Sequence, residues 1–319
     1  MGFTRGVVVC FITILLVAAS PFPARAADKK RVTVGNKNFT EQYIIGALMK
    51  QMLEAHGFEV TLRPDLTSMA LRAGMESGHI DICADYTGTA WMVYLKRKHK
   101  PGIDNHTLFS LVREQDAGNG FVWLNPLWNN NTYAMASWPA FVKQHGLRNL
   151  SDLARLYRTE KGQITTFVNF EFSTRPDGMA ALEAFYDFYV AKDHLKTGTP
   201  GTSLIGLREK QADVAMVFGT DASIAKHDWH VYLDDKGFFP PYDLTPCVRK
   251  KVLDRYPEIA EILNELTATF PGGRGKATPQ DVVECRKVWQ EFNAKVDVER
   301  MEPEAVAHEY LREHGLVKD

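Results

Sequence analysis

Residues 81–86 read Asp-Ile-Cys-Ala-Asp-Tyr, and residues 213–218 read Asp-Val-Ala-Met-Val-Phe. Each segment follows an amphipathic helical pattern and a polar turn, and each places an aromatic residue five positions after its first aspartate. Such short apolar runs predict buried strands, here over residues 80–84 and 214–218. Ligands of open α/β sheets bind beyond the carboxyl ends of strands, so Tyr86 and Phe218 would face one cleft from two sheets. The same placement also suits two aromatic residues that are packed in the cores of two separate sheets.

Strands and helices alternate around the first of these segments. Residues 31–34 and 58–62 are predicted strands. A helix is expected from an N-cap at Thr40, because apolar residues then recur at helical spacing, and a second helix is expected over residues 68–76. This β-α-β-α-β order predicts a mostly parallel sheet covered by helices. The apolar residues of the first helix are Ile44, Ile45, Leu48, Met52 and Leu53.

A second α/β block and a helical C-terminal region follow. The second block has predicted strands over residues 132–136, 164–168 and 214–218. Its predicted helices run from a cap at Ser151 to residue 157, and over residues 177–189 and 203–210. The last three predicted helices cover residues 257–270, 279–292 and 303–314, and each has a proline near its start, where a missing N–H costs nothing.

Composition and charge are those of an ordinary globular protein. Of 319 residues, 45% are hydrophobic and 24% are charged, which argues against disordered, collagen-like and coiled-coil chains. The 38 lysines and arginines nearly balance the 39 aspartates and glutamates, so no basic excess indicates a nucleic-acid partner. A chain of this length usually divides into about two domains.

The first 26 residues have the pattern of a cleaved signal peptide. Arg5 precedes an apolar run over residues 7–19, and Ala24-Arg25-Ala26 places small residues at a cleavage site. The run is shorter than the roughly 20 residues that span a bilayer, which disfavours a membrane anchor. We therefore expect cleavage after Ala26 and export to the periplasm.

The sequence contains no recognisable catalytic motif. It lacks the GxSxG, P-loop and HExxH patterns, and His227 and His230 alone do not supply the three protein ligands of a zinc site. No cofactor, metal or catalytic residue is expected. The cysteines beyond the signal peptide are Cys83, Cys247 and Cys285, so at most one disulfide forms. Buried unpaired thiols are favoured, and pairing of Cys83 with Cys247 stays open.

Aromatic and polar residues gather in the segments that follow or precede strands. These segments cover residues 36–39, 86–89, 128–133 and 237–242. Binding residues concentrate in such loops. A trimethylammonium group cannot donate a hydrogen bond and is held best by ring faces, each contributing about 0.5–2 kcal/mol when desolvated. A carboxylate at the other end of such a ligand would need Lys, Arg or oriented donors.

Five short segments of the chain stand out when they are taken together. They are residues 35–42 (GNKNFTEQ), 85–89 (DYTGT), 130–134 (NNTYA), 220–221 (TD) and 235–242 (DKGFFPPY). In this order and spacing they resemble a known family, the substrate-binding proteins of ABC importers for glycine betaine, choline and related osmoprotectants. The resemblance extends over nearly all of the chain after the signal peptide.

The resemblance implies a type II periplasmic binding protein fold, with two α/β lobes and a ligand cleft between them. Lobe one would hold residues 28–131 and 239–319, and lobe two residues 132–238. An aromatic cage of four rings would hold the ammonium group, and Lys37, Thr89 and Arg175 would hold a carboxylate. The implied ligand-binding residues are Lys37, Tyr86, Thr89, Asn131, Tyr133, Arg175, Phe218 and Tyr242.

The chain departs from the family pattern near this expected site. Phe218 stands where the family usually has tyrosine, Asp85 where it often has glutamate, and residues 66–68 read Leu-Thr-Ser where Gly-Gly-Thr is common. The expected protein is a monomer that binds a small quaternary ammonium ligand and delivers it to separate permease and ATPase subunits. Alternatives are a binding protein for choline, carnitine or an amino acid, a sensor, and an exported small-molecule hydrolase.

Overall fold

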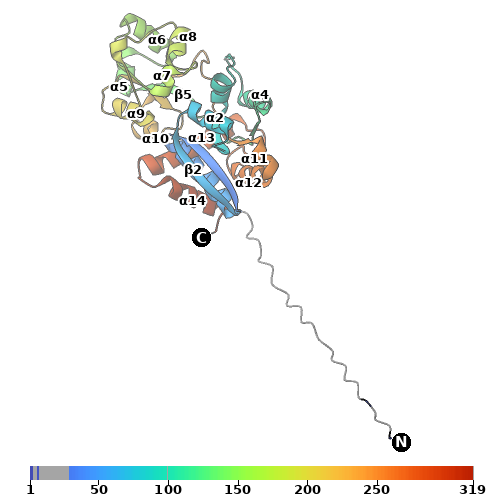
Figure 1. Cartoon of the computed structure of the whole chain (residues 1–319). Helices are drawn as coiled ribbons and strands as arrows, with labels where there is room; N and C mark the ends of the chain where they lie inside the picture. The colour runs from blue at the N-terminus through green and yellow to red at the C-terminus, as the bar shows by residue number, and fades with distance from the viewer. Residues whose placement is uncertain (3–5, 7–28, 99, 319) are drawn as a thin grey trace.

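The computed structural model describes residues 1–2, 6, 29–98 and 100–318. Most of the predicted signal peptide, including its cleavage site, lies outside the described residues. Within the described residues, no helix has the length and apolar character needed to cross a membrane. The remaining chain forms two lobes, each built on its own five-stranded sheet (Figure 1).

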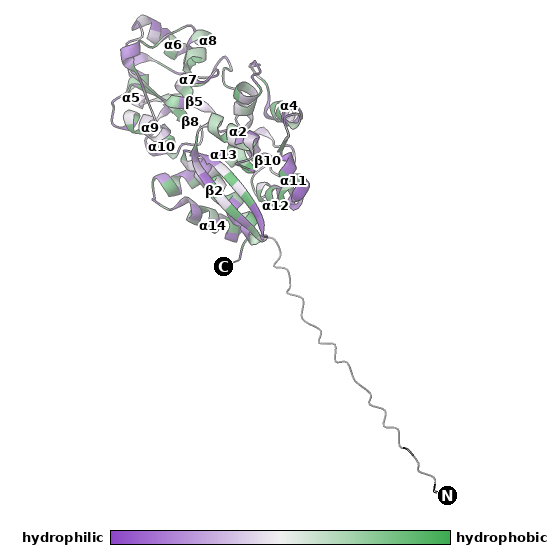
Figure 2. Cartoon of the chain, in the orientation of Figure 1, coloured by the Kyte–Doolittle hydropathy of each residue, from purple (hydrophilic) through white to green (hydrophobic). Residues whose placement is uncertain are grey.

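The first sheet has the strand order β2-β1-β3-β10-β4. β1 pairs in parallel with both β2 and β3, whereas β10 runs antiparallel to β3 and β4. In β2, buried and exposed residues alternate at first, which is typical of a half-buried strand. Hydrophobic and hydrophilic colours alternate along the same strand in Figure 2. The strands are β1 (Lys30–Lys37), β2 (Phe58–Leu66), β3 (Ile82–Tyr86), β4 (Phe121–Trp123) and β10 (Leu244–Arg249).

The second sheet has the order β7-β6-β8-β5-β9 and repeats this mixture of directions. β6 is parallel to β7 and β8, and β5 is antiparallel to β8 and β9. In each sheet four of the five strands therefore run in one direction, as the prediction of mostly parallel sheets requires. The exceptions are β10 and β5, which enter their sheets from the connections between lobes rather than through β-α-β units. The strands are β5 (Tyr133–Ser137), β6 (Thr166–Asn169), β7 (Leu195–Gly198), β8 (Val214–Phe218) and β9 (His230–Val231).

Helices cover both sheets. α1 packs against β1 and β2 and also against α12, α13 and α14, while α9 packs on β6 and β8. The predicted apolar stripe of α1 is confirmed, since its five residues are fully buried. In the first lobe the helices are α1 (Thr40–Ala55), α2 (Ser68–Ser77), α3 (Thr87–Thr89), α4 (Asn105–Ala117), α11 (Lys250–Arg255), α12 (Glu258–Thr267), α13 (Pro279–Asp297) and α14 (Pro303–Glu313), with a π-helix at Ala90–Tyr94. In the second they are α5 (Pro139–His145), α6 (Leu150–Thr159), α7 (Phe170–Thr174), α8 (Met179–Tyr186), α9 (Pro200–Arg208) and α10 (Ala222–Lys226), with a 3₁₀ turn at Lys192–His194.

Two predicted helix caps are wrong. Phe39 occupies the N-cap of α1, and the Thr40 hydroxyl donates instead to Asp297 at 2.7 Å. Asn149 caps α6 by accepting from the backbone N–H of Asp152, and the Ser151 hydroxyl donates to an aspartate elsewhere. In both cases the hydroxyl donates its hydrogen bond to a distant carboxylate, which local sequence cannot indicate.

The chain passes between the lobes in two segments that lie side by side. The Asn131 N–H donates to the Tyr242 carbonyl at 2.9 Å, and the Tyr242 N–H donates to the Asn130 side chain at 2.9 Å. The Leu244 N–H donates to the Asn129 side chain at 3.0 Å. These bonds hold the two crossing segments together and fix two predicted site residues, Asn131 and Tyr242, at the junction of the lobes.

The cysteines are unpaired in the described structure. Cys83 and Cys247 are direct partners across the antiparallel pair β3–β10, and both are buried with free thiols. Cys285 is also buried and free, and its thiol contacts the Leu127 carbonyl oxygen. The interpretation of these residues as buried thiols is confirmed.

Candidate functional site

A cavity of about 140 Å³ lies between the lobes, at the carboxyl ends of β3 and β8. Both lobes contribute to its walls, together with the two crossing segments. Arg175 is the one predicted site residue that does not line it. The predicted residues that do line it are Lys37, Tyr86, Thr89, Asn131, Tyr133, Phe218 and Tyr242.

The four rings of the expected cage gather on this cavity. Tyr133 opens β5 and is the direct partner of Phe218 in the antiparallel pair β5–β8, so their ring centroids lie 5.2 Å apart. The Tyr133 and Tyr242 rings meet edge to face at 5.4 Å. Tyr86 ends β3 and lies on the first lobe's side of the cavity. Since the rings come from different lobes, a ligand among them would touch both.

Phe39 is a fifth aromatic residue on the cavity, which the sequence analysis did not assign to the site. Its ring stacks on Phe218 at 5.1 Å and on Tyr86 at 6.2 Å, so it joins the aromatic residues of the two lobes. Phe39 lies in segment 35–42, directly before α1. This position is the one sequence feature that could have indicated a place for Phe39 at the site. The family resemblance implies a site role only for Lys37 in this segment, so it does not predict the Phe39 ring.

Lys37 is buried and already paired. Its ammonium nitrogen lies 2.5 Å from an oxygen of Asp85, and both side chains are almost inaccessible to solvent. The same nitrogen sits 5.0 Å from the centroid of the Tyr86 ring. The backbone around Lys37 is fixed by Gln42, which accepts from the Lys37 N–H and donates to the Ala84 carbonyl. An ammonium group has three protons, so Lys37 keeps donors beyond the one directed at Asp85.

Arg175 lies behind the cavity wall in a bidentate ion pair. Its guanidinium donates to both oxygens of Asp177 at 2.7 and 2.6 Å. The remaining Nη1 group donates to Glu171 at 3.1 Å and to the Thr89 hydroxyl at 3.3 Å. The Tyr242 hydroxyl also donates to Asp177 at 2.8 Å. Arg175 therefore reaches the cavity through residues that line it.

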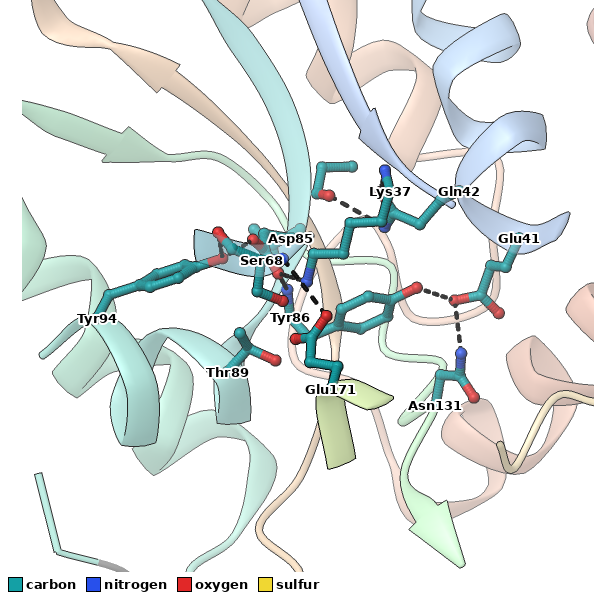
Figure 3. A network of polar contacts seen from close by, with 12 residues as sticks. Lys37, Glu41, Gln42, Ser68, Asp85, Tyr86, Thr89, Tyr94, Asn131 and Glu171 are labelled. Carbon is teal, nitrogen blue, oxygen red and sulfur yellow. Dashed lines mark hydrogen bonds and ion pairs between the residues drawn. The ribbon is translucent and has the colours of Figure 1, made fainter. Parts of the chain in front are cut away.

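Glu41 is a buried acceptor beside the cage, although it is not among the site residues predicted from the sequence. It accepts from the Tyr86 hydroxyl at 2.8 Å and from Asn131 at 3.1 Å (Figure 3). It also accepts from the Thr220 hydroxyl at 2.7 Å. Burial raises the pKa of the Glu41 carboxyl, and these hydrogen bonds oppose that rise. Thr220 belongs to the second lobe and Tyr86 to the first. Glu41 therefore connects the two lobes and also holds the Tyr86 ring in its orientation.

Asp221, next to Thr220, gives the protein a pH-dependent stability. Burial raises the pKa of its carboxyl from 3.8 to about 7, with a further rise from Asp297 and Glu41 and an opposing hydrogen bond from the Phe218 N–H. The folded state thus binds this proton more tightly than the unfolded chain does. The stabilisation is fully present below about pH 4 and is lost as the pH rises through about 7.

We therefore expect Asp221→Asn to flatten the pH dependence of stability. In the wild type the Asp221 contribution to the free energy of unfolding should fall between about pH 4 and pH 7. The asparagine variant should lack that contribution, since its amide does not titrate and its oxygen can still accept from Phe218. Urea denaturation at several pH values measures both slopes, and identical slopes would contradict the assignment.

Residues 30–313 match the family model described as the substrate binding domain of an ABC-type glycine betaine transport system. The chain belongs to this family. Its members are substrate-binding components of ABC transport systems, so this protein is a binding protein and not an enzyme.

Two curated relatives span almost the full chain. A glycine-betaine-binding protein of Pseudomonas aeruginosa is 32% identical over 312 residues, covering 96% of this chain and 95% of the relative. The glycine betaine-binding protein YehZ of Escherichia coli is 28% identical over 313 residues, covering 96% and 97%. The family resemblance inferred from five short segments is therefore confirmed.

Solved structures confirm the fold. A crystal structure described as a glycine betaine/carnitine/choline ABC transporter superposes with a TM-score of 0.66, at 23% sequence identity, over 91% of this chain and 99% of the other. The two-lobed type II binding protein architecture follows from this likeness and from the two sheets described above.

Proposed function

We propose that this protein captures a quaternary ammonium osmoprotectant of the glycine betaine type in the periplasm and delivers it to an ABC permease. The observation that carries the proposal is the set of four rings, drawn from both lobes, on one cavity in a member of this family. Several ring faces suit a methylated ammonium group, which offers charge but no hydrogen-bond donor.

In the proposed complex the ammonium group lies among Tyr86, Tyr133, Phe218 and Tyr242. The ligand carboxylate lies near Lys37 and Thr89, with Arg175 behind them and Asn131 on the adjoining wall. Support comes from the donors that Lys37 retains and from the Arg175 bond to Thr89, which orients that hydroxyl. Choline lacks the carboxylate and is the second candidate ligand.

Ligand binding would favour a closed form of the protein. The proposed lobes are residues 28–131 with 239–319, and residues 132–238. Since a caged ligand would contact both lobes, it would stabilise the closed arrangement over the open one. The closed form would then be recognised by separate permease and ATPase subunits. The proposal includes cleavage after Ala26, export to the periplasm and a monomeric binding protein.

Calorimetry with a matched ligand series tests the proposed function. The series is glycine betaine, proline betaine, carnitine and choline, with unmethylated glycine as the control. We expect the methylated ligands to bind and glycine to fail, because glycine keeps the carboxylate but loses the group that the rings would hold. Choline binding tighter than every carboxylated ligand would contradict the betaine preference, and equal binding of glycine would contradict the cage.

A further inference from the structure

Glu171 places a third carboxylate at the polar end of the cavity. It lies on α7 and lines the cavity wall, with 26% of its side chain exposed. One of its oxygens accepts from Arg175 at 3.1 Å, and the other accepts from the Ser68 N–H at 3.4 Å. Figure 3 shows Glu171 next to Ser68, Thr89 and the Lys37 ammonium group, whereas Glu41 lies at the hydroxyl end of Tyr86.

The cations near this end are already matched by other acids. Lys37 pairs with Asp85, and Arg175 forms its bidentate pair with Asp177. Adding Glu171 gives three carboxylates against two cations, a net charge of -1. The polar end of the cavity therefore does not carry the positive charge expected of a site built only for a ligand carboxylate.

Glu171 is ionised at neutral pH. Burial alone would raise the pKa of its carboxyl, but the charges on Lys37 and Arg175 outweigh burial and lower it. A ligand carboxylate placed near Lys37 and Thr89 would approach this negative charge, and like charges at short range oppose each other. A ligand hydroxyl there could instead donate to Glu171 in a charge-assisted hydrogen bond.

Ser68 adds an unused polar group to the same wall. Its hydroxyl oxygen is buried and has no hydrogen-bond partner among the residues that the structure describes, although Ser68 lines the cavity. A buried hydroxyl without a partner is costly and can accept from or donate to a small polar group of a ligand. Ser68 and Glu171 together thus suit a ligand that ends in a neutral hydrogen-bonding group.

We infer that Glu171 is a specificity-determining residue: it lowers the affinity for quaternary ammonium ligands that carry a carboxylate and raises the affinity for those that end in a hydroxyl. This inference rests on the proposed function, because it takes the four rings as the seat of the ammonium group. It means that the ranking of glycine betaine against choline is set by Glu171 as well as by Lys37 and Arg175.

The test compares glycine betaine and choline by calorimetry on four proteins at one pH and ionic strength. These are the wild type, Glu171→Gln, Glu171→Asp and the control Glu209→Gln, whose exposed side chain pairs with Arg208 away from the cavity. Glutamine keeps the shape and can still accept through its single oxygen from either Ser68 or Arg175, but it removes the charge. Aspartate keeps the charge on a side chain one methylene shorter.

We expect Glu171→Gln to bind glycine betaine at least fivefold more tightly and choline at least threefold more weakly than the wild type does. Glu171→Asp and Glu209→Gln should keep the wild-type ratio of the two affinities within about threefold. If both ligands bind and the ratio in Glu171→Gln stays within twofold of wild type, the inference is overturned while the proposed function stands. Failure of both ligands to bind any of the four proteins would overturn the proposed function and this inference with it.

Discussion

Replacing Tyr133 with alanine should weaken glycine betaine binding by at least about tenfold, or about 1.4 kcal/mol. The Tyr133 ring has the most aromatic neighbours of the four, with Phe172, Phe218 and Tyr242 within 5.4 Å between centroids. The substitution removes one cation–π face, worth about 0.5–2 kcal/mol. It also leaves space that lets the neighbouring rings shift.

Tyr133 offers a clean control, because its hydroxyl has no hydrogen-bond partner within the described part of the chain. Tyr133→Phe keeps the ring and should retain affinity within about twofold, whereas Tyr133→Leu keeps apolar contact without a ring face and should fall between phenylalanine and alanine. Calorimetry gives the three affinities. Equal binding by the leucine and phenylalanine variants would show that apolar contact alone, and not a ring face, acts at this position.

Replacing Asp177 with alanine should destabilise the fold by about 3–5 kcal/mol, the range found when one partner of a buried ion pair is removed. The Arg175 and Asp177 side chains are 4% and 2% exposed, so the arginine would be left as a buried charge without its bidentate partner. The Tyr242 hydroxyl would lose its acceptor as well. We therefore expect weaker ligand binding in addition to lower stability.

Urea denaturation measures this loss as a lower midpoint at an unchanged slope. The matched control is Asp254→Ala, which breaks the exposed pair with Lys250 and should cost at most about 1 kcal/mol. Asp177→Asn keeps the shape of the side chain but loses its charge, and it should fall between the two. A loss below about 1 kcal/mol in Asp177→Ala would contradict this expectation and show that Glu171 or solvent compensates the charge of Arg175.

The parts of the fold that local patterns specify were predicted well. The strand over residues 214–218 has the predicted bounds, and the helix at residues 68–76 differs from α2 by one residue. Tyr86 and Phe218 end their strands as predicted. The similar segments 81–86 and 213–218 form strands of the same length, and the carboxyl ends of both strands lie at the cavity. Strand directions were harder, since β10 joins β3 from a point more than 150 residues away in sequence.

The site could be predicted only in part, because many of its contacts also join residues that are far apart in sequence. The four rings could be named from strand ends, loop segments and family resemblance, but the partners of the charged residues could not. Lys37 pairs with Asp85, 48 positions away, and Glu41 accepts from Thr220, 179 positions away. The first contact depends on the pairing of β1 with β3 and the second on how the lobes meet, and neither leaves a local pattern. The role proposed for Glu171 rests on such pairings, because Glu171 is the acid in excess only once Lys37 is paired with Asp85 and Arg175 with Asp177.

A crystal structure of the protein with glycine betaine tests the central claim most directly. The account predicts that the trimethylammonium nitrogen lies within about 6 Å of the ring centroids of Tyr86, Tyr133, Phe218 and Tyr242, the range of cation–π attraction. It also predicts that the carboxylate points toward Lys37 and Thr89. A ligand nitrogen outside these four rings, or a ligand bound in another cavity, would contradict the account.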